Sequence, residues 1–278
     1  MTVSALRLEA TAFIGFFERQ KNLYRRYWLW EVIWLLYSVV TVLSVGYLAS
    51  GLSSIGALHR GEGLAEAQVY LLVGALLWQY LSLVFFETAF AIVWERWEGT
   101  IEYTFMAPVR RVTHLLGCAC FALAYGLIRA AIILAAMLAA FHLDLDRADF
   151  GGAALVLGAS TFPVLGLGIL TSILPLLYPE KGEQMAFAVQ GVLLLVSGVY
   201  YPLSVLPVWL QGLGVISPLT YVLQGIRTAL LEHGSAGQLL PVAGLLTGMG
   251  AVLIPAGLVL FTLAERRAKR LGLLKRTG

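Results

Sequence analysis

Six long apolar stretches constrain this chain more than any other feature of its sequence. Each is near or above the roughly 20 residues that a helix needs to cross about 30 Å of hydrocarbon. Three of them contain no Asp, Glu, Lys or Arg. The sequence therefore predicts an all-α integral membrane protein, a single transmembrane domain over 1–278 with a six-helix bundle over 29–263. The six predicted spans are residues 29–50, 69–94, 112–141, 151–178, 184–201 and 239–263.

Charge is scarce and unevenly distributed along the chain. Only 13% of the residues are charged, against about 25% in soluble domains, and the net charge of +3 gives little support to nucleic-acid binding. Most basic residues lie before residue 29, within 95–111, within 179–183 or after 263, whereas the alternate connections hold Arg60, Arg147 and Arg227. Because loops rich in Lys and Arg stay in the cytoplasm, we expect both termini there.

The two ends of the chain do not cross the membrane. Residues 4–24 carry apolar side chains at helical spacing, with Arg and Glu on the other side. This pattern predicts an amphipathic helix within 1–28 that lies in the cytoplasmic interface. A helix packed on a partner protein is the alternative. Residues 264–278 form a basic tail, which we expect to be cytoplasmic.

The segment between the second and third spans, residues 94–111, is too polar to cross and too patterned for a loose loop. Glu98 and Glu102 are four residues apart, so they share one face of a short helix. Pro108 should end that helix because proline lacks the N–H needed to continue it. The segment is predicted to be a docking surface. The turn at 179–184 is either a second, smaller contact or a plain connector.

The chain changes character after the fifth span. Pro202 and Pro207 are five residues apart in an apolar stretch, which excludes a straight continuous helix. Ser217-Pro218 then matches a helix start, with proline at the first helical position. Segments 204–213 and 218–232 are too short to cross. We expect them to enter the outer leaflet and return, as irregular backbone can where protein covers it.

Two charged residues lie within predicted spans, where each costs about 3 kcal/mol unless paired or hydrated. Counting along straight helices places Glu87 about 10 Å and Arg129 about 26 Å from the cytoplasmic side. A direct pair is therefore not expected, and Arg129 should reach the outer headgroups or the re-entrant segment. Either residue could line a substrate path or serve a structural bond.

The motifs of common catalytic sites are absent from the sequence. No G-x-x-x-x-G-K-[ST], H-E-x-x-H or G-x-S-x-G occurs, and the four histidines have no carboxylate or cysteine at ligand spacing. We therefore predict that this chain is not an enzyme and holds no cofactor or metal.

Two runs of residues resemble the membrane subunit of type-2 ABC transporters. The first is ERWEGTIE at 95–102 with APV at 107–109. The second is SGVYYPL at 197–203, LPVWL at 206–210, SPLTY at 217–221 and GIR at 225–227. With the six spans and the N-terminal helix, the resemblance covers nearly the whole chain. The size is similar to that of drug, lipo-oligosaccharide and polysaccharide exporter permeases.

The resemblance implies a permease dimer, of two copies or of paralogues, bound to two cytoplasmic ATPase subunits that supply ATP and Mg²⁺. It implies the cytoplasmic (inner) membrane of a prokaryote, and a path for a hydrophobic, amphiphilic or lipid-linked substrate flanked by spans one, two and five. The candidate ATPase-coupling residues are Arg96, Glu98, Gly99, Thr100, Glu102, Pro108, Arg110, Glu180 and Glu183. The candidate outer re-entrant gate is Tyr200, Tyr201, Pro202, Pro207, Trp209, Pro218 and Arg227.

Two other functions are consistent with the same spans. An ion-coupled carrier or channel would transport without a partner, but would need more intramembrane carboxylates than Glu87. A scaffold or lipid-processing enzyme would need polar residues clustered inside the spans. An exporter permease is the function that the sequence favours.

Overall fold

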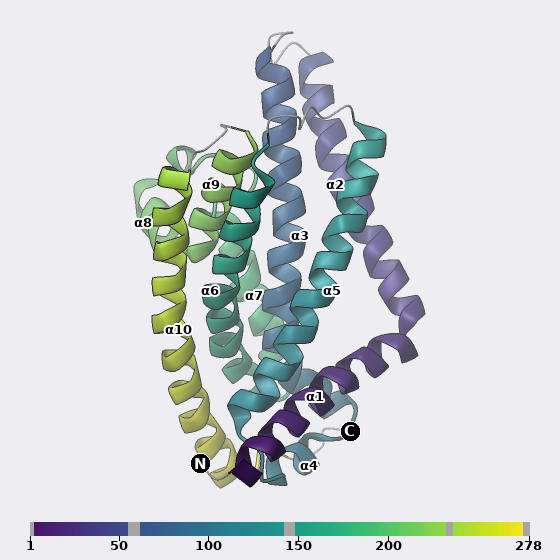
Figure 1. Ribbon diagram of the computed structural model, residues 1–278, viewed down its shortest axis with the longest axis vertical. Helices are drawn as coiled ribbons and strands as arrows, with labels where there is room; N and C mark the ends of the chain where they lie inside the picture. The colour runs from purple at the N-terminus through teal and green to yellow at the C-terminus, as the bar shows by residue number, and fades with distance from the viewer. Residues whose placement is uncertain (1–2, 55–61, 142–147, 232–235, 275–278) are drawn as a thin grey trace.

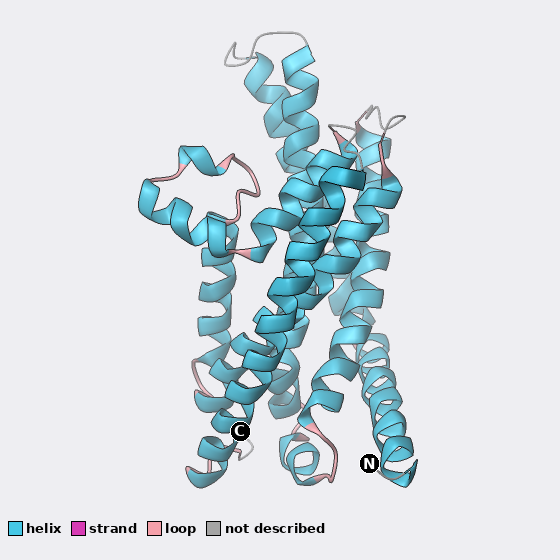
Figure 2. Cartoon of the chain, turned by 60° about the vertical axis from the view of Figure 1, so that its left-hand side comes forward, coloured by secondary structure: helices cyan, strands magenta, loops and turns pink. Residues whose placement is uncertain are grey.

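The computed structural model describes residues 3–54, 62–141, 148–231 and 236–274, and the described part is helical throughout, without strands (Figures 1 and 2). Its elements in chain order are α1 (Val3–Arg26), α2 (Trp28–Ser54), α3 (Glu62–Trp97), α4 (Ile101–Met106), α5 (Arg111–Ala140), α6 (Phe150–Leu177), α7 (Gly182–Val196), the 3₁₀ helix η1 (Leu203–Val205), α8 (Val208–Ile216), α9 (Pro218–Leu230) and α10 (Ala236–Arg270).

Five helices are long and apolar enough to cross a membrane. They are Trp28–Gly51, Ala67–Trp97, Arg111–Ala140, Phe150–Leu177 and Gly237–Arg270, which match five of the six predicted spans. The remaining predicted span, 184–201, contains only the shorter apolar helix Gly182–Val196. The chain is a multi-pass membrane protein.

The predicted fifth span ends early because Gly198 breaks it. Gly198 has a φ of +72°, a left-handed conformation that suits glycine and commonly ends a helix. Pro202, the residue directly before η1, is extended and offers no N–H. The stretch from Ser197 to Tyr201 is thus apolar without being helical, and apolarity alone could not reveal this.

Helices α3 and α6 form the centre of the bundle. In the most apolar part of α3 and of α6, more than half of the residues are buried inside the protein. The same share is less than a third in α2, α5 and α10. Close approach depends on glycines of α6: a Cβ at Gly166 would lie 2.6 Å from Leu253 of α10, and one at Gly168 would lie 2.6 Å from Thr88 of α3. These two glycines serve packing within the chain.

The two ends of the bundle differ in structure. Helix α4 and the ends of α1 and α10 lie at one end, here called the α4 end, whereas α8 and α9 lie towards the other (Figure 1). Helix α1 lies across the α4 end and packs on α5, with Tyr24 in edge contact with Phe121 and Tyr125. The predicted N-terminal helix is present, and the aromatic ring of Tyr24 near its end packs on the bundle of the same chain.

The predicted re-entrant segments are η1, α8 and α9. Helix α9 is packed into the main core through Leu219, Val222, Leu223 and Ile226, so its backbone is covered by protein. Proline does occupy the first position of α9. The Ser217 hydroxyl, however, lies 2.9 Å from the Ser197 hydroxyl and makes no capping bond. It joins the start of α9 to the end of α7.

Candidate functional site

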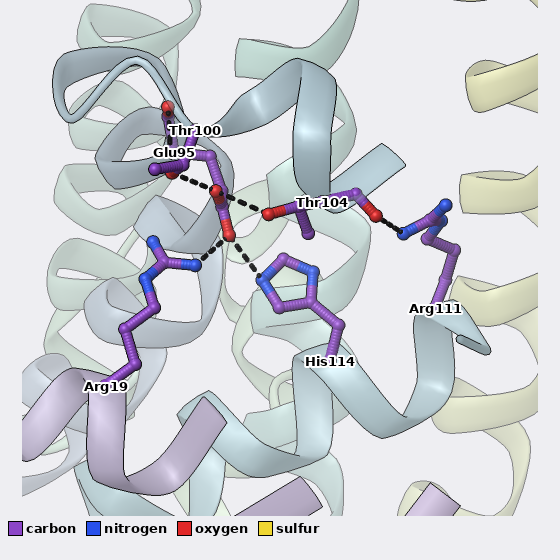
Figure 3. Close-up of polar contacts among 6 residues, drawn as sticks. All are labelled: Arg19, Glu95, Thr100, Thr104, Arg111 and His114. Atoms are coloured by element: carbon purple, nitrogen blue, oxygen red, sulfur yellow. Dashed lines mark hydrogen bonds and ion pairs between the residues drawn. The ribbon is translucent and has the colours of Figure 1, made fainter. Parts of the chain in front are cut away.

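A buried carboxylate, Glu95, organises the α4 end. Glu95 is the last acidic residue of α3 and its side chain is fully buried. It accepts hydrogen bonds from Thr100 and Thr104, the second at 2.9 Å, and it forms an ion pair with Arg19 of α1. His114 of α5 places Nε2 at 3.1 Å from the same carboxylate. These side chains, from α1, α3, α5 and the α4 segment, meet at one point (Figure 3); we call this set the Glu95 cluster.

The Glu95 cluster is well satisfied for a buried charge. A buried carboxylate is tolerated when opposite charges and hydrogen bonds replace its lost hydration. The positive charge of Arg19 and the donors of Thr100 and Thr104 do this here. The cluster therefore fixes the position of α4 relative to α1, α3 and α5.

Arg111 holds the other side of α4. Its guanidinium donates to the carbonyls of Thr104 at 2.6 Å and Phe105 at 2.8 Å, which are carbonyls at the helix end that need partners. It also pairs with Glu265 of α10 at 3.2 Å. Helix α4 is therefore tied to the last long helix as well.

The opposite side of α4 is free of the bundle. Ile101 and Phe105 are buried, whereas Tyr103 is 78% and Met106 is 84% exposed, and Glu102 is exposed beside them. Two large apolar side chains and a carboxylate thus form an exposed face, here called the α4 face: Glu102, Tyr103 and Met106.

The predicted coupling residues separate into surface and interior positions. Glu102, Pro108 and Arg110 are exposed, and Glu180 is exposed in the second turn. Gly99 has a φ of +70°, which allows the turn from α3 into α4. Pro108 follows the helix end as predicted, with Ala107 extended before it.

Three of the predicted coupling residues face the chain itself. Arg96, predicted as an ATPase contact, is 4% exposed and donates to the Leu176 carbonyl of α6 at 3.2 Å, so it packs inside this chain. Thr100 belongs to the Glu95 cluster. Glu98 accepts a hydrogen bond from Tyr27 at 3.0 Å and has Arg26 at 3.6 Å. It joins α1 to the α3–α4 turn.

The predicted outer gate is likewise part surface and part interior. Pro202, Pro207 and Trp209 are exposed, and Tyr201 donates to the Leu195 carbonyl at 2.8 Å. Pro218 and Arg227 are buried, and Arg227 had been predicted to be an outer loop charge.

Arg227 is buried inside the bundle. It donates to the carbonyls of Gly198 at 2.9 Å and Val199 at 2.6 Å, and its guanidinium lies 3.5 Å from the centre of the Tyr70 ring. Arg227 therefore holds the broken end of α7 against α9 and α3. Gly74 makes room for this contact, because a Cβ there would lie 2.1 Å from the Val199 carbonyl oxygen.

A groove of about 630 Å³ runs between α2, α3 and α7, with contributions from α1 and α5. Nearly half of its lining residues are aromatic, against 12% of the whole chain, and five of them are tryptophans: Trp30, Trp34, Trp78, Trp94 and Trp97. Among its lining residues are Glu183 at the start of α7 and Tyr200 beyond its end. We call this the aromatic groove.

The two intramembrane charges both line the aromatic groove but do not pair with each other. Arg129 donates to the Ser38 hydroxyl at 2.8 Å and lies 3.9 Å from Glu31, both on α2. The expectation that Arg129 reaches the headgroups or the re-entrant segment is therefore wrong. Glu87 is 7% exposed, and no ion pair to it occurs among the described residues.

Sequence reasoning missed the partners that connect these regions. Glu95 was quoted as part of a motif without a role, and Arg19, His114 and Glu31 were given none. Glu95 lies near the end of α3 and His114 near the start of α5. Because the chain enters and leaves the α4 segment at these two points, the sequence could have indicated that the two residues lie close together. In the described part of the chain, no group of three or more His, Cys, Asp or Glu could hold a metal.

The family of the chain follows from comparison with known proteins. Residues 12–231 match the model of the ABC-2 type transporter family. This match spans most of the chain, and the chain belongs to that family. It is an ABC transporter permease. A search of curated proteins gave no match.

Proposed function

We propose that this chain is the permease subunit of an ATP-driven exporter, moved by separate ATPase subunits that bind the α4 face. The observation that carries this proposal is the α4 face itself. Tyr103 and Met106 are almost fully exposed on a short helix that is rigidly attached to four long helices. Exposed aromatic and Met side chains with a neighbouring charge are typical of protein interfaces.

Attachment of α4 explains how a partner could drive transport. A partner changes the conformation only through contacts that differ between two states. A push on α4 reaches α1, α3 and α5 through the Glu95 cluster and reaches α10 through Arg111 and Glu265. ATP and Mg²⁺ would be bound by the partner, and this chain would supply movement and a path.

The substrate path that we propose is the aromatic groove. It lies between α2, α3 and α7, the helices of predicted spans one, two and five, and its aromatic walls suit an amphiphile. A second copy or a paralogue would close the open side. In this arrangement α7 and the residues that follow it, up to η1, cross the membrane as the sixth span. Both termini and α4 lie in the cytoplasm of a prokaryote, and α8 and α9 lie towards the outside.

Co-purification tests the docking role of α4. Met106→Asp places a charge in the apolar α4 face and should reduce recovery of a co-expressed ATPase by at least about tenfold, since buried unpaired charges at an interface cost several kcal/mol. Val208→Asp on α8 is the matched control, because Val208 is also 84% exposed but lies towards the other end. Equal recovery of the ATPase with both variants would contradict the proposal.

Orientation is tested by labelling in cells. Met106→Cys should react with a membrane-impermeant maleimide only after the cells are opened, whereas Val208→Cys should react in intact cells. Labelling of position 106 from outside would exclude a cytoplasmic partner at α4. Gradient-driven flux through the purified chain without an ATPase would instead favour an ion-coupled carrier.

A further inference from the structure

The aromatic groove contains a buried carboxyl group, that of Glu87, which forms no ion pair among the residues that the structure describes. Glu87 is only 7% exposed, and it lines the groove. Its Oε2 has no hydrogen-bond partner among the described residues, and the Tyr24 side chain lies near the carboxyl group. A charge in this position without a counter-ion is costly. Such a group is expected where a ligand supplies the missing partner.

The charge of Arg129 acts on Glu87 from a distance, but the two form no ion pair among the described residues. Arg129 is engaged by Ser38 and Glu31, and Tyr125 donates to the same Glu31 carboxylate at 2.9 Å. Glu183 adds a second acidic group at the start of α7. Because the charges of Arg129 and Glu31 offset each other, Glu87 and Glu183 give the groove an excess of acidic groups.

The walls beside Glu87 suit a cation with a large apolar body. Phe86 and Phe90 flank Glu87 on α3 and stack with their centroids 3.7 Å apart. Phe187 of α7 contacts both rings, at 4.9 Å and 5.6 Å. Aromatic faces attract organic cations and bind their apolar parts at the same time. An anion would meet the carboxylates and the electron-rich ring faces, which both disfavour it.

The position of Glu87 distinguishes a soluble cation from a lipid headgroup. Glu87 lies seven residues before Trp94 and ten before Trp97 on α3, which corresponds to about 10–15 Å along the helix. Tryptophans are enriched at headgroup level. A lipid that keeps its headgroup at that level would therefore place its cation near Trp94 and Trp97 and short of Glu87.

We propose that the aromatic groove is a binding site for a soluble amphiphilic organic cation, with Glu87 as its counter-ion and Phe86, Phe90 and Phe187 as its aromatic wall. This inference rests on the proposed function, because it assigns a substrate class to the proposed path. The cation supplies the ion-pair partner that Glu87 does not have among the described residues, and its apolar body displaces lipid or water from the ring faces.

Two probes of nearly the same size and opposite charge test the proposal. Tetraphenylphosphonium and tetraphenylborate are titrated into the full-length chain in lipid nanodiscs, with its ATPase bound where one co-purifies. Five of the seven tryptophans line the groove, so quenching of tryptophan fluorescence reports occupancy. We expect the cation to bind more tightly than the anion by about tenfold or more, as expected for a charge pair partly removed from water.

Variants assign the preference to Glu87. Glu87→Gln keeps the shape of the side chain and should weaken tetraphenylphosphonium binding by about tenfold or more, while tetraphenylborate binding stays equal or improves. Glu87→Asp should restore part of the preference for the cation. Glu18→Gln is the control, since Glu18 is an exposed carboxylate of α1 outside the groove. Retained binding of tetraphenylborate shows that the Glu87→Gln variant is folded.

Several results would overturn the proposal. These are equal binding of the two probes, tighter binding of the anion, or an unchanged affinity of Glu87→Gln for tetraphenylphosphonium. The affinity for tetraphenylphosphonium is also compared between nanodiscs of phosphatidylcholine and of phosphatidylglycerol. A weaker affinity in phosphatidylcholine would show that a cationic lipid headgroup occupies the site and would exclude the soluble cation. Equilibrium binding of the probes needs no ATP hydrolysis. If no ATPase co-purifies, the proposed function is refuted, but the binding measurement still tests the role of Glu87.

Discussion

Glu95 and Glu87 are two buried carboxylates on one helix, eight residues apart, and they have opposite surroundings. Glu95 has a positive charge from α1, two hydroxyl donors from the α4 segment and a histidine from α5. Glu87 has Tyr24 near its carboxyl group and no ion pair among the described residues, and the charge of Arg129 acts on it only from further away. The comparison separates a charge that assembles the protein from one that is held ready for a ligand.

The largest expected effect is the loss of Glu95. Glu95→Ala leaves the Arg19 charge and the donors of Thr100 and Thr104 without their acceptor, and removing one partner of a buried pair costs about 3–5 kcal/mol. We expect a marked fall in the thermal stability of the purified chain and, because α4 is released, loss of ATPase co-purification. Glu95→Gln should be intermediate. A variant as stable as the wild type would show that the cluster is not structural.

Loss of Arg227 should have the second-largest effect on stability. It tests whether a buried, hydrogen-bonded charge at the other end of the bundle stabilises the protein as Glu95 does. Arg227→Met leaves the carbonyls of Gly198 and Val199 without their donor, at a cost of about 1–3 kcal/mol for each buried group. The melting temperature in detergent should fall, and the α7–α9 junction should become more sensitive to protease. Arg267→Met, at an exposed position of α10, is the control and should change little.

Glu87→Gln should have the smallest effect on stability. No ion pair is broken, and a neutral amide is less costly to bury than a carboxylate, so the unfolding free energy should change by less than about 1 kcal/mol or rise. The same melting assay checks this. A loss as large as that of Glu95→Ala would show that Glu87 has a structural partner and would remove the contrast between the two residues.

Much of the fold could be predicted because long apolar helices are a local property of sequence. Five spans, the helix at the N-terminus and the end of α4 before Pro108 all follow from runs of neighbouring residues. The break in α7 could not be predicted from apolarity, since Val199 and Tyr200 are as apolar as the residues before them. It depends on Gly198 and on a contact with Arg227, 29 residues further along the chain.

The site was less predictable because its contacts join distant segments. Arg19 and Glu95 are 76 residues apart, and nothing in the motif at 95–102 shows that Arg96 is directed inward while Glu102 is directed outward. As expected, no ion pair joins Glu87 and Arg129 among the described residues, but both line one groove, which the count of depth along straight helices did not predict. It could not identify Ser38 and Glu31 on α2 as the partners of Arg129.

The construction of α4 separates what holds the helix from what it displays. Glu95 and Arg111 secure it through Thr104 and the carbonyls at its end, and neither anchor uses Glu102, Tyr103 or Met106. Those three positions are therefore open to replacement without disturbing the permease. If the proposed ATPase docks on this face, then replacing three side chains on a single turn would change which ATPase the permease accepts.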